Sequence, residues 1–113
     1  MKYIGSCHCK NIEFEIETDL KKIVQCNCSI CIRRNAKMIM VPKDNFALTK
    51  GEGDLALYQF NSNIAKHYFC KKCGIYTHHN RKSDPNGMGV NLGCIDLLDA
   101  TGYKALSFDG RKL

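Results

Sequence analysis

Eight cysteines in a chain of 113 residues constrain this protein more than any other feature of its sequence. Cys94 stands alone, and the other seven fall into three short clusters. The clusters are a C-x-C pair, a C-x-C-x-x-C triplet and a C-x-x-C pair that glycine follows: Cys7 and Cys9; Cys26, Cys28 and Cys31; Cys70 and Cys73. Such spacings let sulfur atoms converge on one point, as metal binding requires.

The N-terminal residues, MKYIGSCHCK, show neither the apolar run nor the small-residue cleavage site of a secretory signal peptide. No segment approaches the apolar length that a bilayer-spanning helix needs. We therefore expect a soluble, cytoplasmic protein without a membrane partner. In that reducing compartment, clustered cysteines bind metals or do thiol chemistry more often than they form disulfides.

The formal net charge of +6 comes from basic residues that are scattered along the chain. They occur as separate pairs, such as Lys21-Lys22 and Lys71-Lys72, and not as one stripe along which a phosphate backbone would lie. This pattern indicates solvated surface charge and argues against nucleic acid as a partner.

Short apolar or alternating segments recur along the chain at intervals of roughly 8–12 residues, which is typical of an all-β protein. The clearest is NIEFEIE, in which Ile12, Phe14 and Ile16 share one face and three glutamates share the other. Further strands are predicted in KKIVQC, AKMIMV, NFALTK, LALYQF, AKHYFC and MGVNLG. Turns are predicted at Gly51-Glu52-Gly53 and at Asp84-Pro85-Asn86-Gly87, and SICIRRN can form one helical turn. We expect one domain of antiparallel sheets over residues 1–113.

One combination of the clusters gives a complete four-thiolate site. The spacing C-x-x-C-G is typical of a zinc knuckle, in which Gly74 takes a backbone conformation that a Cβ would oppose. Joined to Cys7 and Cys9, this pair would close the chain across 60 intervening residues. Closed four-thiolate zinc sites are structural and contribute folding free energy, which a chain with a small core needs.

The remaining triplet, Cys26, Cys28 and Cys31, has the ligand count of a catalytic zinc, with one position left for an exchangeable ligand. The alternative is a closed site whose fourth ligand is another side chain: Cys94, His8, His67, His78 or His79. Zinc with three thiolates carries a net charge of −1, so it is a poor generator of hydroxide but accepts a soft thiol. A thiol held there loses its proton and remains nucleophilic, which indicates attack on a small electrophile.

The order G-S-C-x-C, then C-x-C-x-x-C before arginine, then F-C-x-x-C-G resembles the glutathione-dependent formaldehyde-activating enzyme family from residue 4 to about residue 99. The stretch FCKKCGIYTHHNRKSDPNGMGVNLGCID is most similar to the centromere protein V branch. The resemblance implies an all-β fold of the Mss4-like, or β-tent, type. It implies a structural zinc on Cys7, Cys9, Cys70 and Cys73, and a catalytic zinc on Cys26, Cys28 and Cys31.

The activity that the resemblance implies is that of a carbon–sulfur lyase running in the synthetic direction, joining glutathione to formaldehyde to give S-hydroxymethylglutathione. Arg33 and Arg34 follow the triplet, and a guanidinium can clamp a carboxylate of such a thiol substrate. Alternatively, they are surface residues or donors to a metal-bound sulfur. Two other functions remain open from the sequence: a zinc-stabilised module that binds a protein without turnover, and a thiol or zinc sensor.

The remaining candidates have simpler interpretations. Cys94 is expected to be a small buried residue, with a thiol near the open zinc as the alternative. We expect His67 to be a hydrogen-bonded core or interface histidine. If they lie on a strand, His78 and His79 face opposite sides of it, so only one can serve a given site, for instance as a proton shuttle. Four aromatic residues are expected in the core: Tyr58, Phe60, Tyr68 and Phe69.

Overall fold

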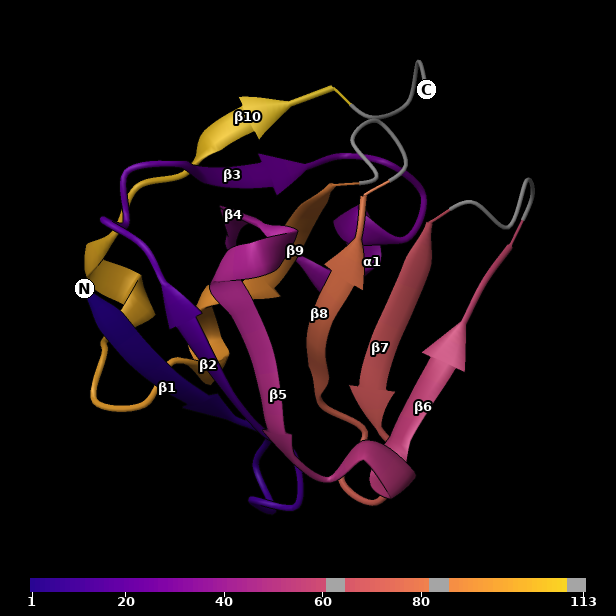
Figure 1. Cartoon of the computed structure of the whole chain (residues 1–113). Coiled ribbons are helices and arrows are strands. Elements are labelled where there is room, and N and C mark those ends of the chain that lie inside the picture. Colours follow the sequence, from indigo (N-terminus) through magenta and orange to yellow (C-terminus); the bar gives the residue numbers. More distant parts are fainter. Residues whose placement is uncertain (61–64, 82–85, 110–113) are drawn as a thin grey trace.

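Ten short strands in two sheets form most of the regular structure in the computed structural model, which describes residues 1–60, 65–81 and 86–109. The smaller sheet is antiparallel and has the order β1–β2–β5: β1 Lys2–Ser6, β2 Glu13–Glu17 and β5 Phe46–Lys50. The larger sheet has the order β10–β3–β4–β9–β8–β7–β6: β10 Leu106–Phe108, β3 Ile23–Cys26, β4 Met38–Pro42, β9 Gly87–Asn91, β8 Tyr76–Asn80, β7 Lys66–Cys70 and β6 Leu55–Tyr58. Figure 1 shows β1 and β2 on the left, β5 near the centre, and β8, β7 and β6 to its right.

Helical structure in the described residues is limited to single turns. The α-helix α1, Cys31–Arg34, is the turn predicted in SICIRRN. It ends at Asn35, whose left-handed φ of 51° lets its N–H bond the Cys31 carbonyl at 2.9 Å. The 3₁₀ turns are Lys43–Asn45, Glu52–Asp54, Leu92–Cys94 and Ala100–Gly102. None of the helices in the described part of the chain is long and apolar enough to cross a membrane.

The core lies between the two sheets because each sheet turns an apolar face toward the other. On β2, Phe14 and Ile16 are buried while Glu15 and Glu17 are exposed, so the predicted alternation is confirmed. Ile39 on β4 and Val90 on β9 belong to the same buried cluster. Each fully buried side chain of this size contributes about 2 kcal/mol of hydrophobic stabilisation.

Two edge strands differ from the sequence prediction. The predicted strands include neither β1 nor β10, nor the inner strand β8, and β10 pairs with β3 in parallel, whereas only antiparallel sheets were expected. Both edge strands are short; β10 is largely exposed, as Leu106 illustrates at 70% exposure, whereas β1 ends in the buried Gly5 and Ser6. Pairing with a neighbouring strand, and not their own apolar pattern, sets their conformation. The predicted turn at Gly51 is confirmed by its φ of 91°, but Asp84 and Pro85 of the other predicted turn lie outside the described residues.

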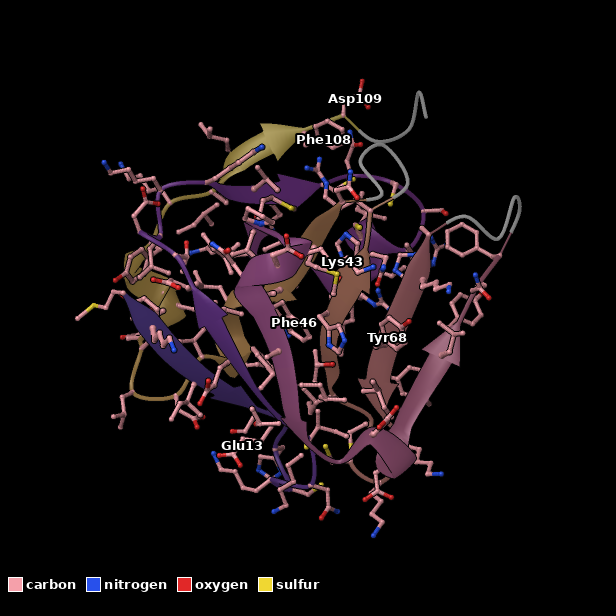
Figure 2. All side chains as sticks on the ribbon, in the orientation of Figure 1. Glu13, Lys43, Phe46, Tyr68, Phe108 and Asp109 are labelled. Carbon is pink, nitrogen blue, oxygen red and sulfur yellow. The ribbon has the colours of Figure 1, made fainter. Side chains whose placement is uncertain are left out.

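His78 and His79 on β8 point to opposite faces of the larger sheet, as predicted. The His78 ring lies in the core, 4.5 Å from the ring of Phe46 and 4.8 Å from that of Tyr68. Figure 2 labels both of these aromatic residues. Thr77 Oγ1 and His78 Nδ1 share a hydrogen bond of 2.8 Å. Burial lowers the pKa of His78 from its ordinary 6.5 to about 4.

This burial makes His78 a source of acid sensitivity. Below pH 6.5 His78 is protonated in the unfolded chain, whereas in the native protein it stays neutral down to about pH 4. The free energy of unfolding therefore decreases as the pH is lowered through this window. From pH 7 to pH 5, we expect the wild type to lose about 2 kcal/mol more unfolding free energy than His78→Phe. Urea titrations at the two pH values measure this difference, and both proteins keep all eight cysteines, so loss of metal affects them alike. An equal loss in both proteins would contradict the assignment.

Candidate metal centres

The structure brings Cys7, Cys9, Cys70 and Cys73 together, with all four sulfur atoms within 4.8 Å of one another. The Sγ atom of Cys9 lies 3.6 Å from that of Cys7 and 3.6 Å from that of Cys70. A tetrahedral zinc with bonds of about 2.3 Å separates its sulfur ligands by about 3.8 Å. The donor set and its spacing therefore fit a metal ion such as zinc.

The turn between β7 and β8 has the hydrogen bonds of a metal knuckle. Gly74 N donates to the Cys70 carbonyl at 2.8 Å, and Cys70 N donates to the Ile75 carbonyl at 3.0 Å. Gly74 has a φ of 79°, which confirms the left-handed conformation predicted for it. Cys73 N points at Cys70 Sγ, at 3.5 Å. Backbone N–H groups directed at sulfur in this way are a feature of zinc knuckles.

The loop after β1 supplies the other half of this site. Cys7 N donates to the Ile12 carbonyl at 3.1 Å, and Ile12 N returns a bond to Cys7 Sγ at 3.3 Å. At the end of β1, Ser6 Oγ donates to Asp96 Oδ1 at 2.7 Å, and Lys10 Nζ, from within the loop, donates to Ser6 Oγ at 2.9 Å. These bonds fix both sides of the C-x-C loop beside the knuckle. In Figure 1 this loop and the β7–β8 turn both lie at the bottom of the molecule.

Cys26, Cys28 and Cys31 form a second group whose sulfur atoms also lie within 4.8 Å of one another. Cys26 ends β3 and Cys31 begins α1, and all three side chains are partly buried. Cys28 N donates to Cys26 Sγ at 3.4 Å. In residues 1–60, 65–81 and 86–109, no histidine, aspartate, glutamate or further cysteine joins this group as a fourth ligand. Figure 1 shows the β3–α1 segment at the upper right, far from the C-x-C loop.

Cys94 lies elsewhere, as a small buried residue in the core cluster. Its Sγ donates to the Tyr76 carbonyl at 3.5 Å. Burial, followed by the charges of Cys7 and Cys73, raises the pKa of Cys94 to about 12. The expectation of a small buried cysteine is confirmed.

Arg34, at the end of α1, contacts two residues of the larger sheet. Its guanidinium carbon lies 3.6 Å from the centroid of the Tyr76 ring. Its Nη1 lies 3.1 Å from His67 Nδ1 on β7. The Tyr76 hydroxyl shares a hydrogen bond with His79 Nδ1, and the His67 and His79 rings lie 5.5 Å apart. We call these four residues the Arg34 network: Arg34, His67, Tyr76 and His79.

The Arg34 network carries its positive charge on the arginine. Burial, with the charge of Arg34 as the second cause, lowers the pKa of His67 to about 4. Burial also lowers the pKa of His79 to about 3, with His67 and then Arg34 as further causes. Both rings are uncharged at neutral pH, so His67 Nδ1 accepts the hydrogen bond that Arg34 donates. His67 is thus the buried, hydrogen-bonded histidine that the sequence predicted.

Sequence reasoning missed Tyr76. The pairing of β7 with β8 shifts between Tyr68 and Phe69, which leaves Thr77 as an extra residue on β8. This bulge places Tyr76 beside His79, with ring centroids 6.1 Å apart, although strict alternation would separate them. Nothing in the sequence marks the bulge. Burial raises the pKa of Tyr76, and the charges of Arg34, Cys31 and Cys28 also act on its hydroxyl.

Arg33 and Arg34 take different positions, although they are adjacent in the sequence. Arg33 is exposed, and its Nη1 donates to the Ser29 carbonyl at 2.6 Å.

The expectation that Tyr58 lies in the core is wrong, because its side chain is 49% exposed. It lies on β6, the edge strand, where it stacks on Phe60 at 5.7 Å. An edge strand has a neighbour on one side only, which leaves the Tyr58 ring half exposed.

Two comparisons with known proteins agree with this arrangement. The model of the glutathione-dependent formaldehyde-activating enzyme family matches residues 2–108. The crystal structure of a Rhodobacter sphaeroides protein, a structural genomics target, is similar with a TM-score of 0.87 and 37% sequence identity. That match covers 95% of this chain and 98% of the other. The predicted all-β, Mss4-like fold is confirmed, and the chain belongs to the glutathione-dependent formaldehyde-activating enzyme family.

Proposed function

We propose that this chain is a zinc-dependent enzyme of the carbon–sulfur lyase type that joins glutathione to formaldehyde, giving S-hydroxymethylglutathione. The observation that carries the proposal is the contrast between the two cysteine groups, one with four sulfurs and the other with three. Four thiolates complete a tetrahedral zinc, whereas three leave a position for a substrate. Membership of the family supports the same class of activity.

The proposed reaction site is the group formed by Cys26, Cys28 and Cys31. Zinc bound there would supply a position for the incoming sulfur and would favour its thiolate form. The protein holds the three ligands on one short segment between β3 and α1, and their partial burial leaves room for access from solvent. Three thiolates against one divalent ion give a negative centre, which suits addition of a thiol and disfavours activation of water.

Arg33 is the residue that we assign to a substrate carboxylate. Glutathione has two carboxylates, and a guanidinium binds such a group through two parallel hydrogen bonds. The bond to the Ser29 carbonyl holds Arg33 against the loop that carries Cys28 and Cys31, while its side chain is exposed. The cytoplasm is the compartment that we propose, since it keeps glutathione and the cysteines reduced.

Turnover tests the proposal directly. NMR exchange between formaldehyde and its glutathione adduct is measured with increasing amounts of zinc-loaded protein. We expect the exchange rate to rise in proportion to the protein concentration. The control is bovine serum albumin at matched concentrations, which reports non-specific effects of protein. No acceleration at any concentration of the zinc-loaded chain would refute the proposed reaction.

A further inference from the structure

The Arg34 guanidinium is held in one orientation before any substrate arrives. The Tyr76 ring lies 3.6 Å from its carbon, and His67 Nδ1 accepts from its Nη1 at 3.1 Å. His67 is only 4% exposed, and Tyr76 is itself held by its hydrogen bond to His79. An arginine side chain normally loses about 2 kcal/mol of rotamer entropy when it is fixed, and here that ordering is built into the fold.

This fixed cation lies beside the three-cysteine group. Arg34 and Cys31 are three residues apart on α1, so they project from the same face of the helical turn. Tyr76, which contacts Arg34, also lies within electrostatic range of Cys31 and Cys28. Arg34 therefore lies on the same side of the α1 turn as Cys31, one of the three cysteines. His67 and His79 are uncharged, so Arg34 supplies the positive charge of its network there.

We propose that Arg34 is a catalytic residue, whose guanidinium donates a hydrogen bond to the aldehyde oxygen while the thiolate adds to the carbonyl carbon. This inference rests on the proposed function. In the step, a sulfur lone pair forms the new carbon–sulfur bond and the carbonyl π pair moves to oxygen. The oxygen then takes a proton from water, and this balances the proton that the thiol lost to solvent. No oxidant or reductant is consumed.

The chemistry suits arginine in this position. Charge develops on oxygen only as the bond to sulfur forms, so a donor fixed in advance stabilises the transition state more than the substrate. Arginine stays protonated at neutral pH, so it contributes charge and hydrogen bonds without giving up its proton. It also offsets the negative charge of a three-thiolate centre, which would otherwise repel a developing oxyanion.

The test compares two small thiols on cobalt-substituted protein, where binding of sulfur changes the visible spectrum. Mercaptoacetate carries negative oxygens close to its sulfur and mimics the anionic adduct, whereas 2-mercaptoethanol carries a neutral hydroxyl. We expect wild-type protein to bind mercaptoacetate at least ten-fold more tightly, and Arg34→Met to lose this preference. The matched control is Lys66→Met, which removes a charge from an exposed position on β7 next to His67. It should keep the preference.

Arg34→Lys keeps the positive charge but lacks the planar guanidinium. It replaces Arg34→Met in the test if that variant does not fold. Its preference for mercaptoacetate over 2-mercaptoethanol should be at least three-fold smaller than that of the wild type. In turnover with glutathione and formaldehyde, Arg34→Met should lower kcat roughly 100-fold with little change in KM for the thiol. If both thiols bind and every Arg34 variant keeps the wild-type preference, the inference about Arg34 is wrong while the proposed function stands. If neither thiol changes the wild-type spectrum, the proposed function itself fails and this inference fails with it.

Discussion

Replacing Cys9 by serine is expected to unfold the chain. Cys9 is exposed, so the substitution leaves no cavity and its effect reports the loss of a metal ligand. The four-cysteine group ties the loop after β1 to the β7–β8 turn. Structural zinc contributes about 10–16 kcal/mol in small domains, against a typical total stability of about 5–15 kcal/mol. We expect far-UV circular dichroism of Cys9→Ser to show no cooperative thermal transition.

The matched control is His8→Ser, which changes the exposed residue between the two cysteines of the same loop. It should keep both metals and melt within about 2 °C of the wild type, because exposed substitutions usually change stability by less than 0.5 kcal/mol. A Cys9→Ser protein that melts at the wild-type temperature would show that this group does not brace the fold.

Replacing Cys28 by serine is expected to abolish turnover and leave the fold intact. Cys26, Cys28 and Cys31 lie on one short segment, so a metal there closes only a small loop and adds little to the global fold. We expect the variant to lose one of two metal ions per chain and to shift its melting temperature by only a few degrees. Turnover with glutathione and formaldehyde should fall at least 100-fold, as expected for loss of the substrate position.

The neighbouring variant Ser29→Ala controls for disturbance of the loop. The Ser29 side chain is exposed, and the carbonyl that accepts from Arg33 belongs to the backbone, so activity should be retained. If Cys28→Ser unfolds as completely as Cys9→Ser, the three-cysteine group is structural. A zinc-stabilised module that binds a partner without turnover would then describe the protein better.

Much of the fold follows from the sequence because its strands have strong local patterns. Phe14 and Ile16 alternate with glutamates, and only one register buries both of them. Pro42 ends β4, as expected of a residue that cannot donate to a ladder. The edge strands β1 and β10 lack such a pattern, and the parallel pairing of β10 with β3 depends on where the rest of the chain has placed β3.

The candidate site also has one part that the sequence predicts and one part that it does not. The cysteine groups could be predicted because ligands two or three residues apart can converge on one ion, and because the ligand count of a closed site pairs the C-x-C with the C-x-x-C across 60 residues. The Arg34 network could not be predicted, because it joins a helical turn to two strands through contacts between distant parts of the sequence. Its geometry depends on the bulge at Thr77, a displacement of one residue in strand pairing that no local signal encodes.

Zinc K-edge X-ray absorption on the fully loaded protein measures the central contrast most directly. With four sulfurs on one ion and three on the other, we predict a mean of about 3.5 sulfurs per zinc, rising to about 4 when glutathione saturates the protein. The oxygen of a water molecule that occupies the fourth position of the three-sulfur zinc should disappear from the spectrum as the sulfur count rises. A mean that already stands at 4 without added thiol, or that does not change when glutathione is added, would contradict the proposed open position.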